Sequence, residues 1–188
     1  MRMPPVTRIF LFLGCWLLWL APFFIFRPRN RPQAVQKKPV ARVGIILQAI
    51  AFFLVFLHSP AEWREPTVPW RAALGLIPAI PGIVLAWQSI RILGRQWRVD
   101  AGLNADHQLI KTGPYSLVRH PIYASMFLML LAAIAWFGTM PRWPVALVFF
   151  IVGIEIRIRA EDSLLRERFG PEFKAWADLT PAYIPFTR

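Results

Sequence analysis

The sequence predicts an all-α polytopic membrane protein with about five transmembrane helices, and three observations support this fold class. Of the 188 residues, 56% are hydrophobic, whereas an ordinary soluble domain has roughly 45–50%. The mean hydropathy is +0.45. The apolar residues also fall into blocks that a bilayer accepts, since a spanning helix needs roughly 17–25 mostly apolar residues. We therefore expect one integral-membrane domain over residues 1–188.

Five apolar blocks are the predicted spans. They are residues 9–26, 43–58, 72–93, 122–138 and 143–157. The second and the fifth are short, so each would borrow flanking residues or cross a locally thinned bilayer. A count of four or six spans stays open.

Basic residues are concentrated in three of the segments outside these blocks. The segments 27–42 and 91–119 and the tail from Arg157 hold 17 of the 22 Lys and Arg residues. By the positive-inside rule, these three segments are cytoplasmic and the N-terminus lies outside. Attraction to membrane lipids with anionic headgroups accounts for the net charge of +12, so we expect no nucleic-acid partner. Nothing in the sequence indicates an obligate protein partner.

The two long basic loops differ in composition. The segment 27–42 is rich in proline, as expected of a connector without a fold of its own. The segment 91–119 is longer than the roughly 12–15 residues beyond which loops in compact proteins are usually functional or disordered. Because it mixes Trp97 and Tyr115 with polar residues, we interpret it as part of a functional site.

Proline and glycine residues mark the ends of the last helices. Pro121 fits the first position of the fourth helix, where its missing N–H has no cost. The turn "FGTMPRWP" joins the fourth and fifth predicted helices, which should form a hairpin. The fifth helix continues beyond the span as "GIEIRIRAEDSLLRERFG", with Gly170 as the expected C-cap and Pro171 preventing continuation. A short amphipathic helix and an extended end should follow.

Ionisable residues on the continuation of the fifth helix share helix faces. Glu155 and Arg159 are four residues apart, and so are Arg157 and Glu161. This spacing is typical of ordinary ion pairs at a solvated helix end. Ionisable groups at a membrane boundary are also often functional, so both interpretations stay open.

Arg119 and His120 stand directly before the fourth predicted helix. Free N–H groups at the start of a helix form an anion site, and both side chains would add donors to it. Tyr123 follows one turn later. The alternatives are that His120 is an interfacial polar residue, that Arg119 is only a lipid-headgroup anchor, and that Tyr123 belongs to an interfacial aromatic belt.

The sequence lacks the motifs of several common nucleotide-binding, hydrolase and metal sites. No two glycines have the G-x-G spacing of a Rossmann fingerprint or a P-loop, and no G-x-S-x-G elbow occurs. Cys15 is the only cysteine and the three histidines have no H-x-x-x-H spacing, so we expect no metal site.

Two motifs together are similar to those of a known family. The segment "HQLIKTGPYSLVRHPIY" and, some thirty residues later, "RIRAEDSLLRERFGPEF" resemble the isoprenylcysteine carboxyl methyltransferase family in its short prokaryotic type. They resemble the membrane phospholipid methyltransferases more distantly. The resemblance covers about the last ninety residues. It implies a prokaryotic inner-membrane enzyme that uses S-adenosylmethionine, with a cytoplasmic C-terminal cofactor region at about 97–123 and 155–188.

The resemblance also implies roles for single residues. Arg157 and Glu161 would be catalytic, with Arg157 binding the methyl acceptor and Asp162 as the alternative to Glu161. No metal is implied. The implied cofactor-binding residues are His107, Gln108, Leu109, Ile110, Tyr115, His120, Pro121, Ile122, Tyr123 and Glu161.

The expected reaction is therefore methylation of a lipophilic acceptor from the bilayer, foremost carboxyl O-methylation of an isoprenylcysteine-like or isoprenoid molecule. Three alternatives stay open. One is a phospholipid amine N-methyltransferase. Another is a sterol-reductase-like membrane oxidoreductase, in which Arg91, Arg95 and Arg98 would bind the 2′-phosphate of NADPH. The third is a non-enzymatic scaffold or transporter.

Overall fold

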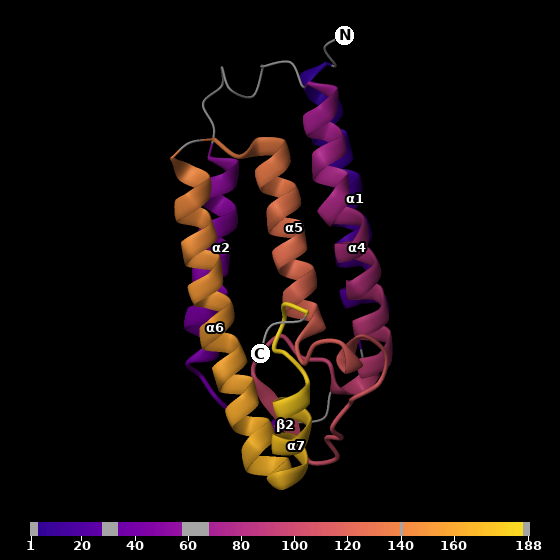
Figure 1. Ribbon diagram of the computed structural model, residues 1–188, viewed down its shortest axis with the longest axis vertical. Helices are drawn as coiled ribbons and strands as arrows, with labels where there is room; N and C mark the ends of the chain where they lie inside the picture. Colours follow the sequence, from indigo (N-terminus) through magenta and orange to yellow (C-terminus); the bar gives the residue numbers. More distant parts are fainter. Residues whose placement is uncertain (1–3, 28–33, 58–67, 140, 186–188) are drawn as a thin grey trace.

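Five long helices lie along the longest axis of the computed structural model, which describes residues 4–27, 34–57, 68–139 and 141–185 (Figure 1). The smaller elements gather at one end of this bundle. The long helices are α1 (Pro5–Ile25), α2 (Ala41–Phe56), α4 (Pro69–Leu93), α5 (Pro121–Phe137) and α6 (Arg142–Phe169). Each of them coincides with one predicted apolar block, and α6 continues beyond its block as predicted.

The helices differ in how well they fit a membrane by length and composition. Val6–Ile25, with a mean hydropathy of 2.0, and Pro69–Gln96, with 1.7, are long and apolar enough to cross one. α2 and α5 are apolar but shorter. Large apolar side chains such as Phe10, Phe53 and Ile77 are exposed on the outer faces of α1, α2 and α4, and such a surface suits lipid. The count of five crossings stays a prediction.

Two pairs of helices form the most extensive contacts, α4 with α5 and α2 with α6. Gly44 and Gly153 face each other where α2 meets α6, and a Cβ atom at Gly153 would lie 2.8 Å from the Gly44 carbonyl oxygen. Small residues of this kind allow membrane helices to approach closely. Between α5 and α6, by contrast, the rings of Phe127 and Phe150 stack with centroids 6.2 Å apart. α5 and α6 are thus joined by the short predicted turn, but each packs mainly on another helix.

A two-stranded antiparallel sheet was not predicted from the sequence. β1 (Ala34–Lys37) pairs with β2 (Gly102–Asn104), and the Lys38 N–H donates to the Ala101 carbonyl at 3.1 Å. The prediction that the segment 27–42 is a plain connector was therefore wrong. The reason is physical: so short a strand exists only because a distant partner supplies its hydrogen bonds.

The end of α6 agrees with the prediction. Gly170 has φ +50°, its N–H donates to the Arg166 carbonyl at 2.9 Å, and Pro171 begins the next helix. This short helix is α7 (Pro171–Leu179). The chain then returns to the start of α5, where the N–H groups of Arg119 and His120 donate to the carbonyls of residues 181 and 182 at 2.9 and 2.8 Å.

Candidate functional site

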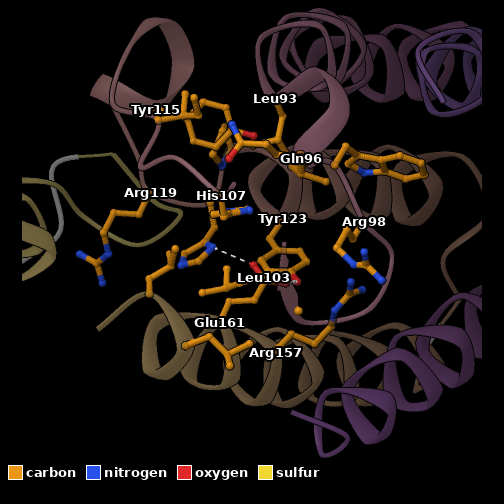
Figure 2. Close-up of a pocket in the computed structure, with 18 of the residues that line it drawn as sticks. Leu93, Gln96, Arg98, Leu103, His107, Tyr115, Arg119, Tyr123, Arg157 and Glu161 are labelled. Carbon is orange, nitrogen blue, oxygen red and sulfur yellow. Dashed lines mark hydrogen bonds and ion pairs between the residues drawn. The ribbon is translucent and has the colours of Figure 1, made fainter. Parts of the chain in front are cut away.

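A cavity of about 260 Å³ lies among α5, α6, α7 and the loop that follows α4 (Figure 2). All eleven site residues expected from the sequence line this cavity. They are His107, Gln108, Leu109, Ile110, Tyr115, His120, Pro121, Ile122, Tyr123, Arg157 and Glu161. Motifs that are separate in the sequence therefore meet at one place. Their roles in binding and catalysis stay predictions.

The loop after α4 forms one wall of the cavity and presents polar groups to it. The Gln108 N–H donates to the side-chain oxygen of Gln96 at 2.5 Å. His107 Nδ1 and the Tyr115 hydroxyl are buried and have no hydrogen-bond partner among the described residues. Burial is the main cause that lowers the pKa of His107, so its imidazole is neutral at pH 7. Burial likewise raises the pKa of Tyr115.

α7 packs against this loop. Leu109 and Ile110 pack with Tyr115, Phe173 and Trp176 in one apolar cluster. The Trp176 indole N–H lines the same cavity region and is also buried without a partner in the described part of the chain. The wall is therefore apolar, with a few unsatisfied polar atoms, as small-molecule sites usually are.

The start of α5 contributes backbone donors. Pro121 is its first residue, and His120 is its N-cap without a side-chain capping hydrogen bond. The N–H groups of Ile122 and Tyr123 belong to the first helical turn, where no intrahelical acceptor exists. Since both residues line the cavity, the helix start is suited to hold an anion there.

His120 lies between two carboxylates of α6. Its Nε2 is 2.8 Å from Asp162 Oδ1, and its Nδ1 is 3.3 Å from Glu161 Oε2. Burial alone would lower the pKa of His120, but the hydrogen bonds to Asp162 and Glu161 outweigh it and raise the pKa to about 9. Burial raises the pKa of each carboxyl, but the hydrogen bonds from His120 outweigh it and hold both below their usual range. At neutral pH the site thus holds an imidazolium between two carboxylates.

Arg119 is turned into the protein. Its side chain is 13% exposed, and its Nη2 lies 3.0 Å from Asp162 Oδ2. Its Nη1 donates to the carbonyls of Ala177, at 3.0 Å, and of Thr180. The alternative that Arg119 is only a lipid-headgroup anchor was therefore wrong. Arg119 joins the start of α5 to α6, to the end of α7 and to the residue after it. Both Arg119 and Glu161 line the cavity, whereas Asp162 does not.

Tyr123 and Arg157 both line the cavity (Figure 2). The Tyr123 hydroxyl donates to Glu161 Oε1. The Arg157 guanidinium carbon lies 4.6 Å from the centre of the Tyr123 ring, a cation–π distance. Its Nη1 donates to Gln48 Oε1 at 2.8 Å and its Nη2 to the Val99 carbonyl at 3.0 Å.

The two ion pairs expected from helix spacing had different outcomes. Arg159 and Glu155 lie 3.8 Å apart, and both are well exposed, so they are an ordinary surface pair of little energetic value. Arg157 does not pair with Glu161 at ion-pair distance; it contacts Gln48, Val99 and Tyr123 instead. The cause is the packing of α2 on α6, which the spacing along one helix does not reveal.

The contributors to the site that sequence reasoning missed include Gln48, the Val99 carbonyl and Trp176. Gln48 had a signal, because it is the one polar side chain within the apolar run "GIILQAIAFFLVF" of α2. A single amide inside such a run is typical of hydrogen bonding between membrane helices. No feature of the sequence indicated the Val99 carbonyl, because every residue has a backbone carbonyl.

The sterol-reductase-like alternative finds less support in the geometry. Arg98 lines the cavity and pairs with Asp100 at 3.1 Å, while Arg91 and Arg95 lie outside its lining, so the three do not form one phosphate site. Among the residues that the structure describes, no group of three or more His, Cys, Asp or Glu side chains could hold a metal ion.

Comparison with known proteins gives several relatives. The chain is 31% identical over 149 residues to a cobalt-zinc-cadmium resistance protein of Cupriavidus metallidurans, covering 77% of this chain and 63% of that protein. It is 29% identical over 152 residues to a nickel-cobalt-cadmium resistance protein of Alcaligenes xylosoxydans xylosoxydans, covering 77% and 64%. It thus spans slightly less than two thirds of both. It is 24% identical over 147 residues to protein-S-isoprenylcysteine O-methyltransferase B of Arabidopsis thaliana, covering 75% and 70%.

The fold also matches a solved structure. The eukaryotic intramembrane Ras methyltransferase, isoprenylcysteine carboxyl methyltransferase, superposes with a TM-score of 0.66 at 22% identity, over 97% of this chain and 68% of that one. The chain therefore shares the fold of this structure. A family model described as phospholipid methyltransferase matches residues 70–172, more than half of the chain and all eleven expected site residues. By this match, the chain belongs to the phospholipid methyltransferase family.

Proposed function

We propose that this protein uses S-adenosylmethionine to methylate the carboxyl group of a lipophilic acceptor, an isoprenylcysteine-like or isoprenoid molecule. The observation that carries the proposal is the cavity itself. Its lining includes buried polar atoms that have no hydrogen-bond partner among the described residues. It also includes the buried side chain of Arg157. The family membership and the shared fold support the reaction class.

The unsatisfied atoms of the cavity fit such a cofactor. His107 Nδ1, the Tyr115 hydroxyl and Trp176 Nε1 are buried without partners among the described residues. Buried polar atoms are nearly always hydrogen-bonded, so three of them around one cavity indicate a ligand rich in donors and acceptors. An amino acid joined to a nucleoside is such a ligand.

The charged groups suit the two ends of its amino-acid part. The first N–H groups of α5, with the His120 imidazolium beside them, would hold the carboxylate. Glu161, which the hydrogen bond from His120 keeps ionised, would bind the ammonium or the ribose hydroxyls. Leu109 and Ile110 would cover the apolar faces of the base.

The chain needs few chemical steps of its own. When bound, the cofactor supplies an activated methyl group. The residues of the cavity align donor and acceptor and exclude water, effects worth about 7–11 kcal/mol together. A carboxylate is already a nucleophile at neutral pH, so Arg157 has only to orient it. Trp19, Phe23 and Met126 line another part of the cavity and would contact the hydrocarbon of the acceptor.

The family name makes a phospholipid amine the second candidate acceptor. An ammonium must lose a proton before it can accept a methyl group, which requires a general base. Glu161 is a poor base, because its pKa lies below the usual range and its two oxygens already bind His120 and Tyr123. The positive charge of Arg157 also disfavours a cationic acceptor. The geometry thus supports a carboxylate better.

We further propose that all five long helices span a prokaryotic inner membrane, with the N-terminus outside and the cavity and C-terminal region in the cytoplasm. The agreement between helices and apolar blocks supports the spans. The concentration of Lys and Arg in the segments at the cavity end supports the orientation. The water-soluble cofactor and the lipid-soluble acceptor would then reach one cavity from different phases.

The test uses the protein purified in detergent. Calorimetric titration should show binding of S-adenosylhomocysteine and none of NADPH. His120→Ala and Glu161→Ala should each weaken this binding about tenfold or more, the value of a hydrogen bond to a charged group. Arg157→Ala should retain binding and lose transfer of labelled methyl groups to a lipophilic carboxylate.

Ser89→Ala, a substitution in α4 outside the cavity lining, is the control. If NADPH bound and S-adenosylhomocysteine did not, the proposed function would be wrong. If Arg157→Ala abolished cofactor binding while His120→Ala left it intact, the division of roles would be wrong.

A further inference from the structure

The buried guanidinium of Arg157 donates hydrogen bonds to neutral groups among the described residues. The residue is 7% exposed, and its hydrogen-bond acceptors are the amide oxygen of Gln48 and the carbonyl of Val99. Within the described residues, no carboxylate lies at ion-pair distance, because Glu161 is engaged by His120 and Tyr123. A buried cation normally has an anionic partner, since an unpaired buried charge is costly. Arg157 therefore has no directly paired carboxylate at this wall of the cavity, and Glu161 acts on its charge only through space.

Gln48 is placed to hold this cation without neutralising it. It lies in the middle of α2 and is 3% exposed. Gly44, one turn earlier, and Gly153 on α6 bring the two helices close enough for the contact. The Gln48 oxygen accepts from Arg157 Nη1 at 2.8 Å, while its Nε2 is buried without a partner in the described part of the chain. A glutamate would have the same shape and would cancel the charge.

Arg157 keeps donors for a ligand. A guanidinium has five N–H donors, and the contacts with Gln48 and Val99 use two. Its Nε is buried and has no partner among the described residues. These remaining donors match the geometry of a carboxylate, which a guanidinium binds through two parallel hydrogen bonds.

We infer that Gln48 is a positioning residue that makes the site selective for an anionic acceptor, because it fixes Arg157 against α2 and leaves it without a directly paired carboxylate. The inference rests on the proposed function for the role of Arg157. It assigns the selectivity to α2, which lies outside the segment that the family model matches. Purely structural packing would not require a neutral partner, since a glutamate would fill the same space.

The decisive variant is Gln48→Glu. Binding of N-acetyl-S-farnesylcysteine and of its carboxamide, which has the same shape without the charge, is measured by calorimetry with S-adenosylhomocysteine bound. The wild type should prefer the carboxylate about tenfold or more, as expected of a charge-assisted pair. Gln48→Glu should reduce this preference to about twofold or less, because the new carboxylate forms an ion pair with Arg157 and neutralises its charge. Its affinity for S-adenosylhomocysteine should not change.

A second variant separates charge from packing. Gln48→Met has a similar length and no charge, so it should keep the preference for the carboxylate. It should lower kcat with the carboxylate acceptor more than it raises KM, because Arg157 loses the contact that orients it. Thermal unfolding should show both variants folded, with Gln48→Glu at least as stable as the wild type.

Gln36→Glu is the matched control, because it adds the same charge at an exposed position of β1 outside the cavity lining. It should leave the preference unchanged. The inference is overturned if Gln48→Glu keeps the preference of the wild type, or if the wild type shows none. If the wild type prefers the carboxylate but transfers no methyl group to it, the proposed reaction fails while the role of Gln48 stands.

Discussion

His120 is the residue whose surroundings have the clearest physical consequence. Its pKa is raised to about 9 in the folded protein, above its ordinary value of 6.5. A raised pKa means that the folded state binds the proton more tightly, so the contribution to stability is fully present below about pH 6.5. It declines as the pH rises through 9. A shift of this size corresponds to about 3 kcal/mol.

This predicts a pH-dependent difference between the wild type and His120→Gln. Thermal unfolding in detergent, followed by circular dichroism from pH 6 to 9.5, should show the wild type more stable at pH 6. The two melting temperatures should converge toward pH 9.5. The measurement does not extend below pH 6. At acidic pH, protonation of Glu161 and Asp162, whose pKa values are lowered in the folded state, would itself reduce stability. A constant difference across the range would contradict the prediction.

The eleven residues that the structure brings to one cavity could be named in advance because the two short motifs that hold them resemble those of a known family. A proline-started helix after an Arg-His pair indicates an anion site wherever the rest of the chain lies. The contact of Arg157 with Gln48 was not predictable, since it joins residues 109 positions apart and depends on which helices pack together. The direction of Arg119 was missed for the same reason, because its partners lie on α6, at the end of α7 and directly after α7.

Among the elements, the contact of α2 with α6 determines the shape of the site most directly. It depends on Gly44 and Gly153, so Gly153→Ala should separate the helices. The new Cβ would lie 2.8 Å from the Gly44 carbonyl and 3.1 Å from the Gln48 side chain. Overpacking of this kind costs about 1–3 kcal/mol, so the melting temperature should fall by several degrees.

Gly14→Ala provides the comparison within the same chain. Gly14 is also a mid-helix glycine, in α1, but nothing lies within 4 Å of the place that a Cβ atom would take there. Alanine should therefore be neutral at this position or slightly stabilising. Equal melting temperatures for the two alanine variants would contradict the role given to the α2–α6 contact.

The elements themselves divide into local and tertiary ones. The apolar blocks predict the long helices because a run of apolar residues needs no distant partner to become a helix in lipid. Gly170 and Pro171 end α6 through local backbone geometry, and this was also predictable. β1 and β2 were not, because three- and four-residue strands are stable only when paired.

At the scale of the whole molecule, the proposed orientation can be tested by labelling. Cys15 is the only cysteine, so Cys15→Ser gives a background free of thiols. Pro141→Cys, at the exposed turn before α6, should react with a membrane-impermeant maleimide on intact bacterial spheroplasts. Lys174→Cys, on α7, should react only after the membrane is opened. The reason is the excess of Lys and Arg at the α7 end. The reverse pattern would contradict the orientation.

The hydrogen bonds between the start of α5 and the chain after α7 also set an order of events during synthesis. Arg119 and the carbonyl of Thr180 are 61 residues apart, and the N–H groups of Arg119 and His120 take their acceptors from the same late segment. A ribosome that has finished α5 has not yet made these partners. The α5 helix can therefore enter the bilayer early, while the cavity at its end is completed only after α7 has been translated. Protein truncated before Thr180 would be inserted and yet lack a finished pocket.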